Sequence, residues 1–339
     1  MSTFLIIVLS ILGIWTSQTM SRSLHKAVTL TERHEQWILR HGRSYENDAE
    51  KKKRFKIFKD NVNFIERFNK GENRTYKMSI NKFADMTREE FLKKFTGWKM
   101  PDHRSINLES DVKMSFRYEN VDDAPPYMDW RERGAVTPIK HQHYCGSCWA
   151  FSAAAAVEGI TQIRTGKLLS LSEQEILDCA VYGNNGCRGG FVENAFSFII
   201  QSNGITSEAN YPYQGYMNYC RARSYPAFAS ITGYENVPAS NERALLQAVS
   251  RQPVSAIIDA DMIEFYAGGV IAYNCGTALN HAILIVGYGT TQDGIDYWLV
   301  KNSWGVDWGE QGYFRVLRNS GFEGGVCGIA MRPAYPTID

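Results

Sequence analysis

One segment, residues 145–151, constrains this chain more than any other. It has the sequence Cys-Gly-Ser-Cys-Trp-Ala-Phe and leads directly into a run of small and apolar residues at 152–157. That run is rich in alanine, the strongest helix former, and Gly166 is a typical helix stop, so we expect a helix over 147–164. Cys148 would then occupy an exposed position in the first turn. Unpaired N–H groups and the helix dipole favour a thiolate there, which predicts a cysteine suited to covalent catalysis.

The number of cysteines is odd. The chain has seven, at positions 145, 148, 179, 187, 220, 275 and 327. A cysteine is more often buried or disulfide-bonded than catalytic, but three disulfides would leave one thiol free. Zinc binding by His141, His143, Cys145 and Cys148 is an alternative. The four residues lack the longer spacer that usually separates ligand pairs, and a metal-bound Cys148 would not be an open nucleophile, so we expect no metal and no cofactor.

The N-terminus predicts export. Residues 4–15 form an apolar stretch with the length of a signal-peptide core, too short to span a bilayer, and small residues follow near Ser17 and Ser21. We expect a signal peptide at 1–21 and passage through the secretory pathway to a vacuole, a lysosome or the cell exterior. Since no second long apolar run follows in the sequence, we do not expect a membrane protein.

Charge is distributed unevenly over the rest of the chain. Residues 22–123 contain 23 Lys and Arg against 17 Asp and Glu, whereas residues 124–339 contain 14 against 19. The two parts should attract each other, and all the cysteines lie in the acidic part. Nucleic-acid binding by the basic part is not expected, because acidic residues are interspersed and an acidic partner lies in the same chain. We expect a basic segment that folds without cysteines, unlike the acidic part, and that can be removed.

A stripe of residues in the basic part carries a family resemblance. Steps of four, four, three, four and four place six residues along one face of a helix: Glu50, Arg54, Phe58, Asn61, Ile65 and Asn69. This stripe resembles the pattern of papain-type propeptides at all six positions. Asn81-Lys-Phe-Ala-Asp85 resembles a second propeptide element, with Ser79 in place of its glycine. Together with residues 145–151, these motifs make the chain similar to a plant-type, papain-like cysteine protease precursor.

The resemblance implies an α+β fold with two lobes and a cleft between them. A helical left lobe would carry Cys148, a strand-rich, barrel-like right lobe would begin near Gly233, and a helical inhibitory propeptide would precede both. The implied division is a signal peptide at 1–21, a propeptide at 22–123 and a peptidase domain at 124–339. Local patterns agree with this fold. Helices are expected at 147–164, 172–179 and 191–201, and strands at 254–259, 281–288, 297–301 and 313–317.

The resemblance also implies a catalytic set. His281 and Asn302 follow Cys148 by 133 and 154 residues, close to the family spacing. His281 opens a β-branched run that predicts a buried strand, and it would hold Cys148 as a thiolate in a thiolate–imidazolium pair. Asn302 would accept a hydrogen bond from the imidazole, shielded by Trp304. Gln142 would hold the oxyanion together with the backbone N–H of Cys148.

Two departures from the family pattern fall near these residues. His143 stands where the family usually has a glycine after Gln142. Arg332 falls at the base of the pocket for the second substrate residue before the scissile bond. If Arg332 points outward the pocket is simply apolar, and if it points inward it shortens the pocket and repels a basic residue.

The remaining substrate contacts follow from the same resemblance. Gly189 and Gly190 would let a substrate backbone approach closely. The pocket would be lined by Phe191, Val192, Ile257, Leu279 and Ala282, so we expect it to favour Leu, Val or Phe.

Family positions imply disulfides Cys145–Cys187, Cys179–Cys220 and Cys275–Cys327. Asn73 begins the one glycosylation sequon in the sequence. The expected partners are peptide and protein substrates, the chain's own propeptide and cystatin-like inhibitors, and the enzyme is expected to be a monomer. Protonation of carboxylates such as Asp85 at low pH should loosen the propeptide and permit cleavage near Asp123.

Because all four catalytic positions are present, we favour an active thiol endopeptidase made as a zymogen. A protease-like protein with a storage, binding or signalling role is the alternative.

Overall fold

The computed structural model describes residues 29–97, 116–273 and 275–339. The predicted signal peptide at 1–21 lies outside the described residues. The chain forms two compact units, one ending at Asp60 and the other beginning at Asn61. Because that boundary falls inside helix α3 (Asp48–Lys70), α3 contributes residues to both units.

The first unit contains α2 (Leu30–Arg40) and the beginning of α3. Three residues of the predicted stripe lie in this part of α3. Arg54 forms an ion pair with Glu50 one turn earlier, at 2.6 Å. Phe58 is fully buried and its ring lies 5.5 Å from that of Trp37 in α2. The stripe therefore packs α2 against α3.

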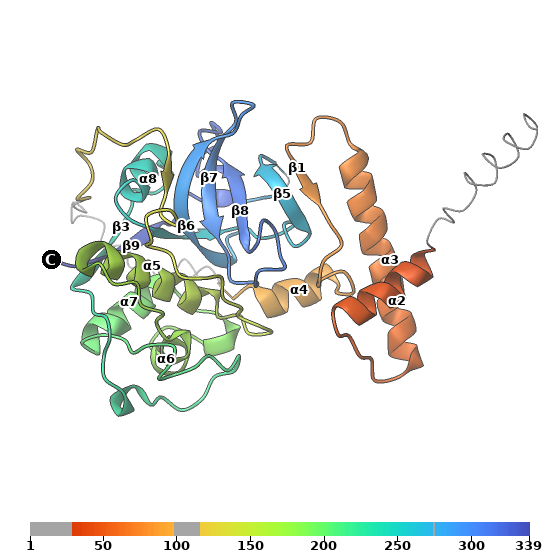
Figure 1. The fold of residues 1–339 in the computed structure, drawn as a ribbon, viewed down its shortest axis with the longest axis horizontal. Helices are drawn as coiled ribbons and strands as arrows, with labels where there is room; N and C mark the ends of the chain where they lie inside the picture. Colours follow the sequence, from red (N-terminus) through yellow and green to blue (C-terminus); the bar gives the residue numbers. More distant parts are fainter. Residues whose placement is uncertain (1–28, 98–115, 274) are drawn as a thin grey trace, which may run out of the picture. The chain divides into compact units, whose positions relative to one another are not determined.

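The second unit contains the other helices. They are α4 (Arg88–Phe95), α5 (Cys148–Thr165), α6 (Glu173–Cys179), α7 (Val192–Gln201) and α8 (Glu242–Val249), with short 3₁₀ turns η1 (Gly186–Arg188), η2 (Ala222–Ser224) and η3 (Val326–Gly328). Helices α5, α6 and α7 gather beside one another (Figure 1). α5 ends at Gly166, whose φ of 74° is the left-handed conformation that glycine adopts most easily. The three predicted helices are confirmed to within one residue at each end.

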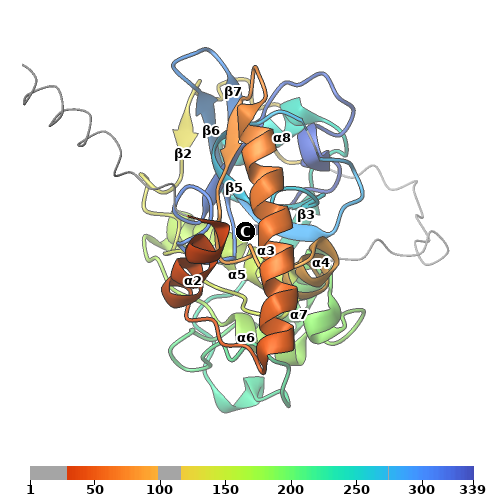
Figure 2. The same ribbon diagram turned by 90° about the vertical axis from the view of Figure 1, so that its right-hand side faces the viewer.

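The strands of the second unit form one mixed sheet. They are β1 (Tyr76–Met78), β2 (Met128–Asp129), β3 (Gly233–Asn236), β4 (Val254–Ile258), β5 (Tyr266–Ile271), β6 (His281–Thr290), β7 (Asp296–Lys301), β8 (Tyr313–Leu317) and β9 (Ala334–Thr337). The strand order is β1-β5-β8-β7-β6-β4-β9-β3, and β2 pairs with β6. Figure 2 shows β2 beside β6. All pairs are antiparallel except β5 with β8. The four predicted strands are confirmed, with ends that differ by at most two residues.

Helix α5 is attached to the sheet by packing and by hydrogen bonds. All of its first fourteen residues are buried, and its alanine face packs on β6. The Ser152 hydroxyl donates to the carbonyl of Ile283 in β6 at 2.7 Å, and the Ser255 hydroxyl of β4 donates to the carbonyl of Ser152 at 3.1 Å. These contacts fix the start of α5 relative to the start of β6.

The other half of the predicted stripe holds the propeptide part of the second unit together. Asn61 Nδ2 donates to the carbonyls of Ala84 and Met86 at 2.8 and 2.9 Å. Asn69 exchanges two hydrogen bonds with the backbone of Met78, at 2.8 and 3.0 Å. β1 then pairs with β5, so the predicted propeptide extends the sheet of the predicted peptidase domain by one strand.

The three predicted disulfides are present: Cys145–Cys187, Cys179–Cys220 and Cys275–Cys327. Cys148 remains free. Within the described ranges, no helix is both long enough and apolar enough to cross a membrane.

Candidate active site

Cys148 is the first residue of α5, as predicted, but it is not exposed. Its exposed fraction is 0%. The Ala282 N–H donates to Cys148 Sγ at 3.4 Å, and the backbone of Gly97 in the propeptide also forms a hydrogen bond with the thiol. The expectation of an exposed cysteine is therefore wrong for the precursor, because the propeptide lies over this residue.

His281 and Asn302 lie together. His281 Nε2 is 2.8 Å from Asn302 Oδ1, which also accepts from the Ser303 N–H at 2.8 Å. Since an amide oxygen only accepts, Nε2 carries the proton of a neutral ring and Nδ1 keeps its lone pair. Nδ1 is buried and has no hydrogen-bond partner among the described residues, which leaves it available as a base.

Trp304 covers this pair as predicted. Its ring stacks on the His281 ring, with centroids 4.6 Å apart and planes 27° from parallel. Trp304 is fully buried, and its indole Nε1 donates to the carbonyl of Phe95 in the propeptide at 3.2 Å. Water is therefore excluded from the His281–Asn302 hydrogen bond.

Burial sets the protonation states of the covered pair. It raises the pKa of the Cys148 thiol to about 11, against the opposing effect of backbone donors such as Ala282 and Gly97. It lowers the pKa of His281 to about 4, against the effect of the hydrogen bond to Asn302. While the site is covered, burial therefore favours a neutral thiol and a neutral imidazole over the charged pair.

Gln142 is fully buried beside the cysteine loop. Its Nε2 donates to the carbonyl of Cys145 at 2.8 Å and to the propeptide carbonyl of Phe95 at 3.2 Å. The Ser303 hydroxyl donates to Gln142 Oε1 at 2.6 Å and fixes the orientation of the amide. Sequence reasoning missed Ser303, although it directly follows Asn302.

His143 takes the conformation that a glycine would take. Its φ is 52°, in the left-handed region that is uncommon for residues with a Cβ atom. Its N–H donates to His141 Nδ1 at 2.7 Å, and the two rings stack with centroids 4.4 Å apart. The loop therefore keeps this conformation without the family glycine, and it is stabilised by His141, which the sequence suggested only as a zinc ligand.

The His141 side chain meets a propeptide lysine. Lys82 Nζ lies 2.7 Å from His141 Nε2 and donates to the carbonyl of Trp304. Burial, the charge of Lys82 and the adjacent His143 lower the pKa of His141 to about 3. His141 is therefore uncharged in the covered chain, with Nδ1 as the acceptor for the His143 N–H.

Gly97 lies against the predicted substrate-binding residues Gly189 and Gly190. The Gly190 N–H donates to the carbonyl of Gly97 at 3.0 Å, and the Gly97 N–H donates to the carbonyl of Asn280 at 3.2 Å. Gly189 has a φ of 116°, and a Cβ atom there would lie 1.6 Å from the Gly97 oxygen. The predicted backbone contact at Gly189 and Gly190 is thus occupied by the propeptide, whose residue Gly97 sequence reasoning missed.

Apolar residues predicted to line a pocket belong to one cluster. Val192, Ile257, Leu279 and Ala282 are each at most 4% exposed, and Phe191 packs against them. Arg332 does not extend freely into solvent: its Nη2 lies 3.1 Å from Glu193 Oε1, next to Val192. The guanidinium is thus neutralised by a carboxylate.

The zinc alternative fails at one of its four ligands, because Cys145 is bonded to Cys187. The expected charge attraction between the two parts is visible in an ion pair of Arg88 in α4 with Asp261. Apolar contacts accompany it: the Phe83 and Phe91 rings lie 5.8 and 5.1 Å from that of Trp304, both edge-on.

Comparison with known proteins agrees with this geometry. Residues 124–337 match the family profile described as papain family cysteine protease, and residues 34–91 match the cathepsin propeptide inhibitor domain. The chain is 47% identical to fruit bromelain of Ananas comosus over 96% of this chain and 92% of that protein. It is 50% identical to the senescence-specific cysteine protease SAG39 of Oryza sativa subsp. indica, over 94% and 93%.

A solved structure of the Amb a 11 cysteine protease, a major ragweed pollen allergen, in its proform superposes with a TM-score of 0.85. The two chains share 40% sequence identity, over 94% of this chain and 97% of that one. The predicted two-lobe α+β fold with a preceding propeptide is confirmed by this similarity. The chain belongs to the papain family of cysteine proteases and is an endopeptidase that carries its own inhibitory propeptide domain.

Proposed function

We propose that Cys148, His281, Asn302 and Gln142 perform peptide hydrolysis through an acyl-enzyme. The Cys148 proton moves to His281 Nδ1, and Sγ attacks the scissile carbonyl carbon. His281 then gives the proton to the leaving amine as the C–N bond breaks, which leaves a thioester. Water, deprotonated by His281, attacks the thioester and restores the thiol. The observation that carries this assignment is the 2.8 Å contact of His281 Nε2 with Asn302 Oδ1, because it leaves Nδ1 as the base.

Gln142 would stabilise the oxyanion that forms in each step. Its Nε2 already donates to a carbonyl oxygen of the propeptide, Phe95 O at 3.2 Å. A donor of this kind contributes about 2.7–4 kcal/mol to transition-state stabilisation. The backbone N–H of Cys148, at the start of α5, would be the second donor.

The propeptide would keep the enzyme inactive in two ways. Residues 95–97 use the hydrogen-bonding groups that a substrate would need, and the burial that they cause holds Cys148 and His281 neutral. Removal of residues up to about Asp123 would admit water and allow the thiolate–imidazolium pair to form. The proposed segments are a signal peptide at 1–21, a propeptide at 22–123 and a peptidase domain at 124–339.

The substrates would be peptides and proteins with an apolar second residue before the scissile bond. The buried walls Val192, Ile257, Leu279 and Ala282 favour Leu, Val or Phe there, and Gly189 and Gly190 would bind the substrate backbone. Because Arg332 is paired with Glu193, the pocket has no uncompensated positive charge.

The biological setting proposed is a monomeric enzyme of the secretory pathway, acting in a vacuole or outside the cell. Cystatin-like proteins are proposed as inhibitors. Asn73, which is exposed, is the proposed glycosylation site.

Substitution of the nucleophile tests the proposal against a storage, binding or signalling role. Cys148→Ala should abolish hydrolysis of a peptide with Leu at the second position and leave the fold intact, since the site accepts a smaller side chain. Asn302→Ala should lower kcat but keep measurable turnover, because nucleophile and base remain. Equal turnover by wild type and Cys148→Ala would reject the mechanism, and a processed wild-type chain that hydrolyses no peptide would favour the other role.

A further inference from the structure

The last residues of the propeptide contact a second surface of the peptidase domain. Residues 116–123 lie between the two family profiles, which end at residue 91 and begin at residue 124. Phe116 is only 8% exposed. The rings of Phe116 and Tyr118 lie 6.4 and 5.2 Å from that of Tyr335 in β9. A segment next to the proposed cleavage position therefore buries aromatic surface.

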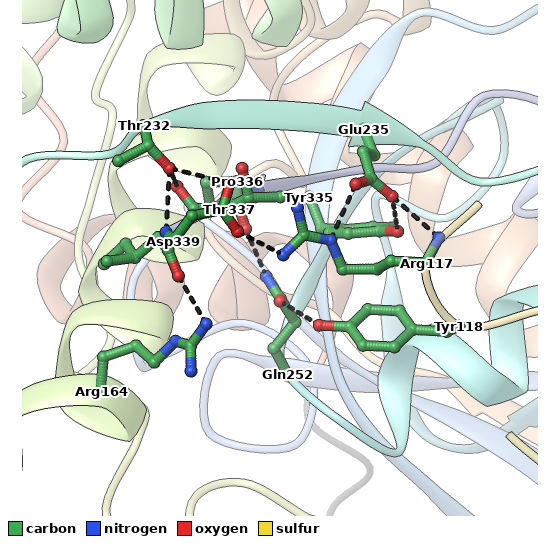
Figure 3. Close-up of polar contacts among 11 residues, drawn as sticks. Arg117, Tyr118, Arg164, Thr232, Glu235, Gln252, Tyr335, Pro336, Thr337 and Asp339 are labelled. Carbon is green, nitrogen blue, oxygen red and sulfur yellow. Dashed lines mark hydrogen bonds and ion pairs between the residues drawn. The ribbon is translucent and has the colours of Figure 1, made fainter. Parts of the chain in front are cut away.

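Arg117, between these two aromatics, is bound by two carboxylates. Its backbone N–H and its Nε both donate to Glu235 of β3, at 3.1 and 2.7 Å, and its Nη1 donates to Asp339 at 3.1 Å (Figure 3). Glu235 also accepts from the Tyr335 hydroxyl at 2.6 Å. Burial acts to raise the pKa of Glu235, but the hydrogen bonds from Tyr335 and Arg117 outweigh it and keep the pKa below its usual value. The surface thus presents a charged, oriented carboxylate to an arginine.

Two buried glutamine side chains form hydrogen bonds with the residues that follow Arg117. The Tyr118 hydroxyl donates to Gln252 Oε1 at 2.9 Å, and Gln252 Nε2 donates to the carbonyl of Pro336 at 2.9 Å (Figure 3). Gln247 Nε2 donates to the carbonyls of Glu119 and Val121, at 3.1 and 3.0 Å. Gln252 and Gln247 are 1% and 6% exposed. Because the Gln252 amide is also held by the carbonyl of Pro336, its Oε1 is oriented toward one position of the bound segment.

Recognition becomes weak after Val121. Asp122 and Asp123 pair with Arg243 and Arg251, but the two aspartate side chains are 81% and 79% exposed. Such exposed pairs contribute at most about 1 kcal/mol. In these pairs the acidic residue belongs to the basic part of the chain and the arginine to the acidic part, so they do not contribute to the overall charge attraction between the two parts. The bound segment is therefore 116–121, and it ends just before the proposed cut.

This surface is separate from the cleft. Arg164, near the end of α5, donates to the carbonyl of Ile338, the neighbour of Asp339 (Figure 3). Cys148 is the first residue of the same helix. Sixteen helical residues at 1.5 Å each separate the two by roughly 24 Å.

We propose that Glu235, Gln247, Gln252, Tyr335 and Asp339 form an exosite whose ligand is the chain's own segment 116–121, and that this segment stays bound after the backbone is cut near Asp123. The ligand class is a peptide with arginine between two aromatic residues, folded into a turn. The turn forms within the segment, since the Glu119 N–H donates to the carbonyl of Phe116 and the Val121 N–H donates to that of Tyr118, both at 3.0 Å. The exosite goes beyond the hydrolytic mechanism and does not depend on it.

Hydrogen exchange in the full-length Cys148→Ala chain tests the docking, since this chain cannot cut itself. Amides of Glu119 and Val121 should exchange slowly. Arg117→Ala should speed their exchange at least about tenfold, because it removes charge-assisted hydrogen bonds. Arg243→Ala, which removes only an exposed ion pair of the same region, is the matched control and should leave the rate unchanged. Wild-type amides that exchange at the rate of a free peptide, or equal effects of both variants, would overturn the proposal.

Retention after cutting is tested on the same chain with a protease that cleaves before aspartate. It cuts at the exposed Asp122 and Asp123 without any activity of the chain itself. In gel filtration with mass spectrometry, the released fragment that contains 116–121 should elute with the peptidase domain. Because residues 76–97 also contact the domain, hydrogen exchange of the cut chain is the deciding measurement. The Glu119 and Val121 amides should stay slow in the cut wild-type segment and become fast in the cut Arg117→Ala segment. Fast exchange in the cut wild-type segment, or its separation from the domain, would show that the exosite does not hold its ligand after cleavage.

Discussion

Gly97 of the propeptide and Gly190 of the peptidase domain meet backbone to backbone, with the Gly190 N–H donating to the carbonyl of Gly97 at 3.0 Å. The backbone around Gly97 is closely surrounded by the backbone of the peptidase domain. A Cβ atom on Gly97 would lie 1.8 Å from the carbonyl oxygen of Gly146, far inside any permitted contact. Inhibition therefore depends on the absence of a side chain at position 97.

Gly97→Ala should uncover Cys148 in the full-length chain. The added methyl group cannot be accommodated against the Gly146 carbonyl, so residues 95–97 must leave their place. We expect alkylation of Cys148 by iodoacetamide at pH 8 to become at least about tenfold faster, measured by mass spectrometry. Gly268→Ala is the control, because its Cβ would meet only the Glu310 side chain, at 3.5 Å. An unchanged alkylation rate in Gly97→Ala would contradict this role.

The alkylation rate should also reveal the protonation state of Cys148. Only the thiolate reacts, and burial raises the pKa of this thiol to about 11 in the covered chain. The rate for the precursor should therefore keep rising up to about pH 11. After propeptide removal the rate should level off several pH units lower, because water and a charged imidazole then stabilise the thiolate. Coincident pH profiles for precursor and processed enzyme would refute the assignment.

His141 should contribute to acid activation. Its pKa is about 3 in the covered chain, where burial, Lys82 and His143 all disfavour its charged form. Once uncovered it regains an ordinary pKa near 6.5, so the open form binds one more proton between about pH 6.5 and pH 3. The covered form is therefore favoured above pH 6.5 and loses stability as the pH falls, by up to about 1.4 kcal/mol per unit. His281, with a pKa of about 4, acts in the same direction.

The test is the pH dependence of precursor processing in wild type and His141→Gln. His141→Gln removes one of the two titrating histidines. The processing rate should therefore rise less steeply as the pH falls from 6.5 to 4, with a slope reduced by up to tenfold per pH unit. His41→Gln, in the first unit, should keep the wild-type slope. If His141→Gln keeps it as well, the imidazole has no part in acid activation.

A buried ionic cluster should dominate the stability of the helical lobe. Lys140 Nζ contacts Glu158 at 2.9 Å and Glu173 at 2.6 Å, and both carboxylates are 1% exposed. Lys140→Met leaves these carboxylates without their shared cation, which should cost about 3–5 kcal/mol of unfolding free energy. Urea unfolding of the Cys148→Ala chain measures it. Arg243→Ala should cost no more than about 1 kcal/mol, since its pair is exposed. Equal costs for the two variants would be inconsistent with a structural ionic core.

The Arg332–Glu193 pair should set the charge preference of the specificity pocket. Arg332→Ser leaves the largely buried Glu193 carboxylate uncompensated, so cleavage of substrates with Lys or Arg at the second position should increase about tenfold in kcat/KM. Glu193→Gln is the reciprocal variant and should shift the preference toward acidic residues. A peptide library varied at that position measures both, and identical profiles in all three proteins would exclude the pair from specificity.

Much of this architecture follows from local sequence. The alanine run and Gly166 define α5, and the β-branched residues after His281 define β6. The odd cysteine is free, and the three disulfides match the family positions. Each of these features depends on residue types whose propensities or chemistry act over short distances or through a known family spacing.

The interactions that keep the active site inactive could not be predicted from local sequence. Burial of Cys148 depends on Gly97, and the low pKa of His141 comes from burial and from Lys82, 59 residues earlier. Ser303 orients Gln142 from 161 residues away. No periodicity links such positions, because the contacts arise only when the propeptide lies across the assembled domain. The exposed position of Cys148, expected from the helix terminus alone, was wrong for the precursor for that reason.

The pairing of β1 with β5 has a consequence for the processed protein. When β1 departs with the propeptide, β5 becomes the outermost strand of the sheet and exposes a row of free N–H and C=O groups. Such an edge can recruit a strand from another molecule and begin aggregation. Gly268 and Gly269 lie in the middle of β5, and glycine is a poor strand former, so the edge exposed by maturation is weakly suited to recruit a new partner. The propeptide thus also covers this sheet edge for as long as the chain remains a precursor.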